Sequence, residues 1–130
     1  MRDLARIFKA LADETRLQML ALLLERGELC VCDLETALQV TQSKASRHLR
    51  YLANAGLVRD RRDGTWVLYR VAEDPRDDAG LVIEFLREVL RTRDLRAVRA
   101  RLEDWLAKKG GRAACAPRRR PSLTTKRRNS

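Results

Sequence analysis

Residues 29–56 read LCVCDLETALQVTQSKASRHLRYLANAG, and this stretch decides the fold. Asp33 is a suitable N-cap for a short helix, and Thr41 is a suitable N-cap for a second one. Gly56 stands where a helix commonly ends in the left-handed conformation. The apolar positions follow helical spacing: Leu34, Ala37 and Leu38, then Ala45, Leu49 and Leu52. Two short helices joined by a tight turn at residues 39–41 predict a helix-turn-helix motif.

The next stretch, LVRDRRDGTWVLYRV at residues 57–71, changes to a period of two, because Val67, Tyr69 and Val71 alternate with other residues. Asp63-Gly64 is typical of a two-residue hairpin turn whose central positions both take positive φ. This pattern predicts a β-hairpin, or wing, directly after the helix-turn-helix.

Helices are predicted on both sides of this unit. Leu4, Ile7, Phe8 and Leu11 share one stripe, and a second helix is expected to begin at Asp13 or Glu14 and to end at Gly27. A further apolar stripe runs through residues 82–106 and is too long for one small core to cover, which favours a dimer. The five-residue step from Leu90 to Leu95 leaves open whether that helix bends or restarts. The predicted fold is mostly α with a β-hairpin wing, a winged helix-turn-helix that dimerises through its terminal helices.

Composition bounds the class of protein. The 130 residues are too few for two good cores, and 28 Lys and Arg against 18 Asp and Glu give a net charge of +10 that suits a polyanionic partner. Residues 110–130 carry seven positive side chains and no acid, so we expect a basic, disordered tail after one DNA-binding and dimerisation domain at residues 1–109. No apolar run is long enough for a membrane span, and we expect a cytoplasmic protein.

The predicted second helix of the motif presents side chains suited to double-stranded DNA. Gln and Arg make paired hydrogen bonds to base edges, whereas Ser and Lys hold phosphates. The wing arginines are expected at phosphates or in the minor groove; pairing with Asp60 and Asp63 is their alternative. An ordinary solvated helix face, and a packing role for His48, also stay open. The predicted DNA-binding residues are Gln42, Ser43, Lys44, Ser46, Arg47, His48, Arg50, Tyr51, Arg59, Arg61 and Arg62.

Residues 28–71 resemble the arsenic-repressor (ArsR/SmtB) family of winged-helix bacterial repressors, in its arsenic-responsive branch. The resemblance covers roughly residues 4–106 and is most specific in ELCVCDL, QSKASRHLRYL and GTWVLYRV. It implies a homodimer that occupies operator DNA and leaves it when a toxic metal or metalloid binds.

Cys30 and Cys32 offer two soft sulfur ligands, which suit As(III) or Sb(III) better than hard cations. Side chains at i and i+2 of a regular helix point about 200° apart, so one ion held by both must distort the helix end. Their alternative is a pair of small buried hydrophobes. We interpret the pair as the sensor of the inducer.

The third ligand is less clear from the sequence. The arsenic-responsive branch has ELCVCDLC, and Glu35 stands here at the position of its third cysteine. We predict Cys115 as the third metal ligand beside Cys30 and Cys32; Glu35, a solvent ligand, or a bystander role for Cys115 are the alternatives. The zinc-sensing branch uses histidines on the last long helix, and residues 81–106 contain none.

These features together predict a repressor and no enzyme. A sensor of oxidants or persulfide is an alternative within the same fold, in which Cys30 and Cys32, or either one with Cys115, form a disulfide. A short Cys-x-Cys ring is strained. A thiol enzyme is disfavoured because the sequence lacks Cys-x-x-Cys. A nonspecific chromosome-associated protein would bind DNA with a specificity ratio near one, whereas repressors favour their site by about 10³ or more.

Overall fold

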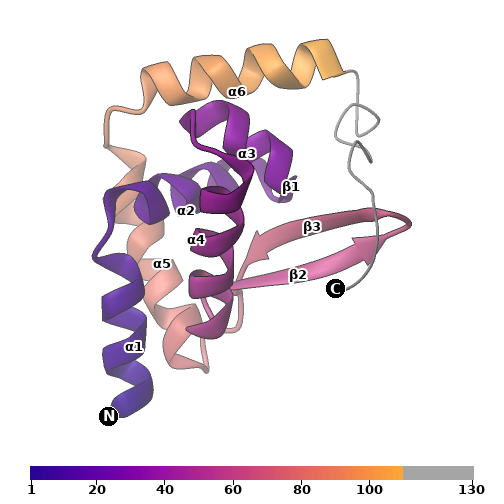
Figure 1. Cartoon of the computed structure of the whole chain (residues 1–130). Coiled ribbons are helices and arrows are strands. Elements are labelled where there is room, and N and C mark those ends of the chain that lie inside the picture. The colour runs from indigo at the N-terminus through magenta and orange to yellow at the C-terminus, as the bar shows by residue number, and fades with distance from the viewer. Residues whose placement is uncertain (110–130) are drawn as a thin grey trace.

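Helix α2 (Glu14–Arg26) is the centre of the computed structural model, which describes residues 1–109. Met19, Leu20, Leu22 and Leu23 of this helix are fully buried, as its nearly continuous apolar run predicts. The Asp13 side chain caps the helix by accepting from the backbone N–H of Arg16 at 3.0 Å. The other elements (Figure 1) are α1 (Arg2–Leu11), β1 (Leu29–Cys30), α3 (Val31–Leu38), α4 (Gln42–Asn54), β2 (Val58–Asp63), β3 (Trp66–Val71), α5 (Asp78–Arg91) and α6 (Arg96–Lys109). Of these, α1, α3, α4, α5 and β3 pack against α2.

The helix-turn-helix consists of α3 and α4. Thr41 caps α4 as predicted, because its Oγ1 accepts from the backbone N–H of Lys44 at 3.2 Å. The prediction that Asp33 caps α3 is wrong: the N-cap is Cys30, and Asp33 is the third helical residue. Its carboxylate accepts from the backbone N–H of Cys30 at 2.9 Å, the acidic half of a capping box. Helix α3 therefore begins earlier than the N-cap preference suggests, and it includes Cys32.

The wing is a hairpin in a three-stranded antiparallel sheet of order β1-β3-β2. Its turn lies one residue later than predicted, because Asp63 pairs with Trp66 and the loop is Gly64-Thr65. Only Gly64 has positive φ, at +68°, which is the pattern of a type II′ turn. The buried residues of the hairpin are Val58 of β2 and Leu68 and Val71 of β3, whereas Val67 and Tyr69 are half-buried.

The predicted long C-terminal helix restarts rather than bends: α5 ends at Arg91 and α6 begins at Arg96. Helix α6 lies across α3 (Figure 1), and Leu95, Val98 and Leu102 are buried within the chain. Much of the stripe that favoured a dimer is therefore covered by the same chain. The large apolar side chains that stay exposed on helices are Phe8 of α1, Tyr51 of α4, and Leu81 and Phe85 of α5.

Two predictions from the sequence lie outside the described residues, namely the disordered tail at 110–130 and any role of Cys115. Among residues 1–109, no helix has the length and apolar character needed to cross a membrane.

Replacing Gly80 of α5 by alanine is expected to destabilise the fold by about 3 kcal/mol, because a Cβ there would lie 1.8 Å from the carbonyl oxygen of Asp74. Gly64→Ala is the matched control. Its Cβ would meet nothing within 4 Å, so only the positive φ opposes it, at about 1 kcal/mol. Urea denaturation of both variants measures the difference, and equal midpoints would contradict the assigned close approach.

Candidate functional site

Helix α4 presents its polar face to solvent. Ala45, Leu49 and Leu52 are fully buried, which fixes the rotation of the helix on the core. The opposite face therefore carries the predicted base-reading and phosphate-binding side chains. Ser46 is half-buried, and the exposed members are Gln42, Ser43, Lys44, Arg47 and Arg50.

The three wing arginines differ in their surroundings. Arg59 and Arg62 are exposed on β2. Arg61 makes two hydrogen bonds to the Glu28 carboxylate, at 2.7 and 2.8 Å, and these hold the pKa of Glu28 below its ordinary value. Arg61 thus has a partner in Glu28, a residue just before β1. An arginine held in this way is less available to a phosphate than its two neighbours.

Arg16 of α2 contacts α4 through two of its side chains, His48 and Tyr51. Its guanidinium lies 4.1 Å from the centre of the Tyr51 ring, and its Nη1 lies 3.2 Å from Nδ1 of His48. Its Nε donates to the carbonyl of Ala10 at 2.7 Å. Burial lowers the pKa of His48, an effect that Asp13 opposes and Arg16 reinforces. His48 thus has the packing contacts that were the alternative to a phosphate contact.

The two cysteines lie at the junction of β1 and α3. Cys30 is the last residue of β1 and is only 4% exposed, whereas Cys32 is half-buried in the first turn of α3. The structure records both sulfurs in the disulfide-bonded state. Among residues 1–109, no group of three or more His, Cys, Asp or Glu side chains could hold a metal ion. Glu35, which stands at the position of the third cysteine, is half-buried on α3.

Asp33 connects this junction to α6. Its Oδ1 accepts from Nε1 of Trp105 at 2.8 Å and from Nζ of Lys109 at 2.6 Å, while its Oδ2 accepts from the backbone N–H of Cys30. Nζ of Lys109 also lies 3.7 Å from Sγ of Cys30. The side chains of Asp33 and Lys109 are each only 4% exposed, so the ion pair is buried.

Sequence reasoning missed Lys109 and used Trp105 only as part of an apolar stripe. Lys109 follows Lys108 in a basic helix end, and nothing in the local sequence separates the two. In the structure Lys108 makes an exposed ion pair with Asp104, whereas Lys109 is buried against α3. Only the crossing of α6 over α3 tells them apart.

Comparison with known proteins bears on this geometry. The sequence model described as "Bacterial regulatory protein, arsR family" matches residues 13–60, from the cap of α2 into β2. An "Arsenical resistance operon repressor" of Bacillus subtilis (strain 168) is 43% identical over 74 residues, which are 57% of this chain and 70% of that protein. The chain belongs to the arsR family.

Two further relatives show how much of each chain the similarity covers. An "Arsenical resistance operon repressor" of Escherichia coli (strain K12) is 59% identical over 66 residues, 51% of this chain and 56% of that protein. The chain thus spans a little over half the length of this curated relative. A solved homodimeric winged helix-turn-helix DNA-binding domain, Mb0332 from Mycobacterium bovis, superposes with a TM-score of 0.59 at 36% identity, covering 69% of this chain and 80% of that one.

The fold and family predictions are confirmed by these comparisons. The family and its named members are regulators of transcription, in agreement with the prediction that the chain is no enzyme. The match at residues 13–60 includes both cysteines and all of α4, but neither α1 nor α6. The contacts of α6 with the cysteine junction are therefore a feature of this arsR-family chain that the family match does not supply.

Lys109→Met is expected to destabilise the protein by about 3 kcal/mol, since removing one partner leaves the buried Asp33 carboxylate without its counter-charge. Lys108→Met is the matched control on the next residue. Its pair with Asp104 is exposed on both sides and contributes about 0.5 kcal/mol or less. Denaturation of the two variants gives the comparison, and equal losses would show that the Asp33 pair is not stabilising α6 on α3.

The single histidine gives a direct test of the brace behind α4. A folded-state pKa below about 6.5 means that the unfolded chain binds more protons, so this contribution to stability is full above pH 6.5 and falls as the pH drops below it. Asp13→Asn keeps a good N-cap but removes the charge that raises the pKa, so the pKa of His48 should fall further. NMR titration of the imidazole measures the pKa of His48 in the native protein and in the Asp13→Asn variant. A midpoint above about 6.5 in the native protein would contradict the burial of His48 against α2.

Proposed function

We propose that this chain is a repressor that binds operator DNA as a homodimer and releases it when Cys30 and Cys32 capture As(III) or Sb(III). The observation that carries the proposal is the position of the two sulfurs at the start of α3, the helix that leads directly into α4. The names of the curated relatives, which refer to arsenical resistance, support the choice of inducer. Such a repressor acts at the chromosome, in the cytoplasm.

The DNA-binding half of the proposal rests on α4 and the wing. The N-terminal half of a recognition helix enters the major groove, so Gln42 and Arg47 reach base edges while Ser43, Lys44 and Ser46 hold phosphates. Arg59 and Arg62 extend the contact along the wing. The two halves of a dimer then read half-sites about one helical turn apart.

The homodimer is supported by apolar side chains that one chain leaves uncovered. Phe8, Leu81 and Phe85 are 57%, 55% and 66% exposed, and they lie on α1 and α5. Large exposed apolar side chains are typical of an interface. The related domain from Mycobacterium bovis is homodimeric, which supports the same assembly here.

The inducer site is proposed to consist of Cys30, Cys32 and Cys115. Sulfur is the preferred ligand of thiophilic metalloids, and the pair supplies two such atoms at one helix end. The Lys109 ammonium lies 3.7 Å from Sγ of Cys30, so a cation stands beside the proposed site. Cys115 is proposed to complete the set as a third sulfur ligand, with Glu35 or a solvent ligand as the alternatives.

The proposed inducer site and the DNA-binding helix α4 are close together along the chain. Capture of one ion by residues at i and i+2 requires a change at the first turn of α3, where Asp33 holds the backbone of Cys30. Helix α3 has eight residues and ends at Leu38, and α4 begins at Gln42. A coupling of about 1 to 3 kcal/mol, typical of allostery, lowers operator affinity about 5- to 150-fold.

A second candidate function is a thiol-based redox sensor of the same fold. The disulfide-bonded state of Cys30 and Cys32 is the observation that favours it. In that case an oxidant takes two electrons from the dithiol, two protons are released, and the new sulfur-sulfur bond replaces metalloid capture as the event that alters α3.

The double variant Cys30→Ser, Cys32→Ser tests the inducer site. Under reducing conditions it should bind operator DNA within about twofold of wild type, because neither residue lies on the exposed face of α4, yet arsenite should no longer weaken that binding. Fluorescence anisotropy with labelled DNA from the upstream region measures both properties.

Two parallel measurements separate the candidate functions. Cys115→Ser alone should reduce the response to arsenite if this residue is a ligand. Peroxide should leave operator affinity unchanged if the site is a metalloid sensor, and should release DNA if it is a redox sensor. Normal arsenite-induced release by the double serine variant would refute the proposed site.

A further inference from the structure

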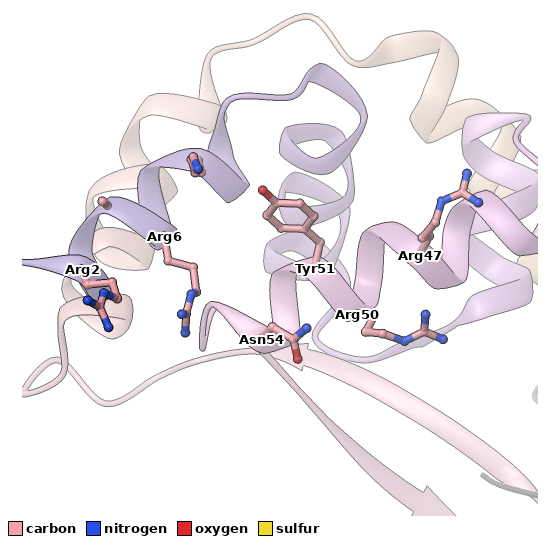
Figure 2. Close-up of a pocket in the computed structure, with 8 residues that line it drawn as sticks. Arg2, Arg6, Arg47, Arg50, Tyr51 and Asn54 are labelled. Carbon is pink, nitrogen blue, oxygen red and sulfur yellow. The ribbon is translucent and has the colours of Figure 1, made fainter.

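A basic groove separates α1 from α4. Its volume is about 510 Å³, and Figure 2 shows Arg2 and Arg6 extending from α1 and Arg47 and Arg50 from α4, with Tyr51 between the helices. Lys9, Ala5 and Asn54 complete its lining, and none of the lining residues is acidic. Five cationic side chains thus gather around one hollow of the surface.

These cations have no acidic partner among residues 1–109, and this distinguishes them from most arginines elsewhere in the fold. Arg61 pairs with Glu28, Arg91 with Glu88 and Arg99 with Glu25. The structure gives no ion pair within residues 1–109 to any of the five side chains of the groove, Arg2, Arg6, Lys9, Arg47 and Arg50. Gathering like charges without counter-charges is unfavourable unless an anion neutralises them.

The geometry of α1 indicates an extended anion. Arg2, Arg6 and Lys9 are spaced i, i+4 and i+7, so they lie on one face of the helix over a length of about 10 Å. Phosphates of one DNA strand follow each other every 3.4 Å or so along the duplex axis, so this length corresponds to about three of them. A single small anion would occupy only part of the groove.

The groove also continues the surface already proposed to face DNA. Arg47 and Arg50 belong to the exposed face of α4, and they form one wall of the groove. Phe8, the exposed apolar residue of α1, points about 160° away from Arg6 around the helix. A second subunit packed on Phe8 would therefore leave the basic face of α1 open.

We propose that α1 is a second DNA-contacting element, in which Arg2, Arg6 and Lys9 bind backbone phosphates beside the segment approached by α4. This inference rests on the proposed operator binding and extends it to a helix outside the family match at residues 13–60. Contacts of this kind fix the position of the protein on the duplex and add affinity, but they carry no base preference.

The test uses the full chain with Arg2→Gln, Arg6→Gln, because glutamine keeps helix propensity while removing charge. Log affinity falls with log salt, and the loss of two phosphate contacts should make this slope less steep by about 1.8. The change should be the same for upstream and random duplexes. The matched control is Arg76→Gln, Arg91→Gln, which removes the same charge from exposed arginines paired with Asp74 and Glu88. Fluorescence anisotropy from about 50 to 300 mM salt gives the slopes.

Two further arms complete the test. Arg2→Lys, Arg6→Lys retains the charges and should restore most of the slope, which shows that loss in the glutamine variant is not misfolding. Inorganic phosphate at constant ionic strength probes a free anion as occupant: phosphate binding that is lost in the glutamine variant, with an unchanged DNA slope, would overturn the inference. So would a glutamine variant whose slope equals that of the control.

The outcome is separable from that of the proposed function. If wild-type protein binds upstream and random DNA equally, specific operator binding fails, while the salt slopes still report whether α1 touches the duplex. If wild-type protein selects upstream DNA and the slopes of the two variants agree, operator binding stands and the role of α1 is refuted.

Discussion

The buried carboxylate of Asp33 is the constraint on which the rest of the site depends. It accepts three hydrogen bonds, from the backbone of Cys30, the indole of Trp105 and the ammonium of Lys109, and it is only 3% exposed. The first bond sets where α3 begins and so where both sulfurs lie. The other two hold α6 across α3. A buried charge with this many partners is costly to disturb, because any lost partner leaves it unsatisfied.

The same constraint gives a physical reason for a link between the cysteines and DNA. The start of α3 and the exposed face of α4 are separated by one eight-residue helix and the turn in which Gln39 is left-handed, with φ of +56°. Arg16 braces the far side of α4 through His48 and Tyr51. In the proposed mechanism, a change at the first turn of α3 passes to α4, whose inner side is held by these contacts and whose polar face is exposed.

The sequence predicted the elements well and their contacts poorly. The start of α2 at Asp13 or Glu14, the cap Thr41, the terminator Gly27 and the apolar stripe of α4 were read correctly because they are local features. Asp33 was misplaced because cysteine is a weak N-cap, so the preference rule chose the better acceptor three residues later. The hairpin turn shifted by one residue because Asp-Gly is the stronger two-residue pattern, whereas the structure uses Gly64 as the first central residue.

Functional residues contributed by distant elements were beyond local patterns. Lys109 reaches Asp33 across 76 positions of the chain, and no periodicity marks it. Helix α1 was interpreted only through its apolar stripe, so the basic face formed by Arg2, Arg6 and Lys9 was passed over. The basic face of α1 forms a groove only together with α4, which lies beside it (Figure 2). These residues are therefore identified by the packing between elements and not by the local sequence pattern.

Hydrogen exchange of the reduced protein, with and without arsenite, tests the central claim most directly. The claim is that capture at the cysteine pair loosens the start of α3 and carries through to α4. The account predicts faster exchange of backbone amides in α3 and the first turn of α4 on arsenite binding, with the buried amides of α2 unchanged. Unchanged protection in α3 and α4 at saturating arsenite would contradict it.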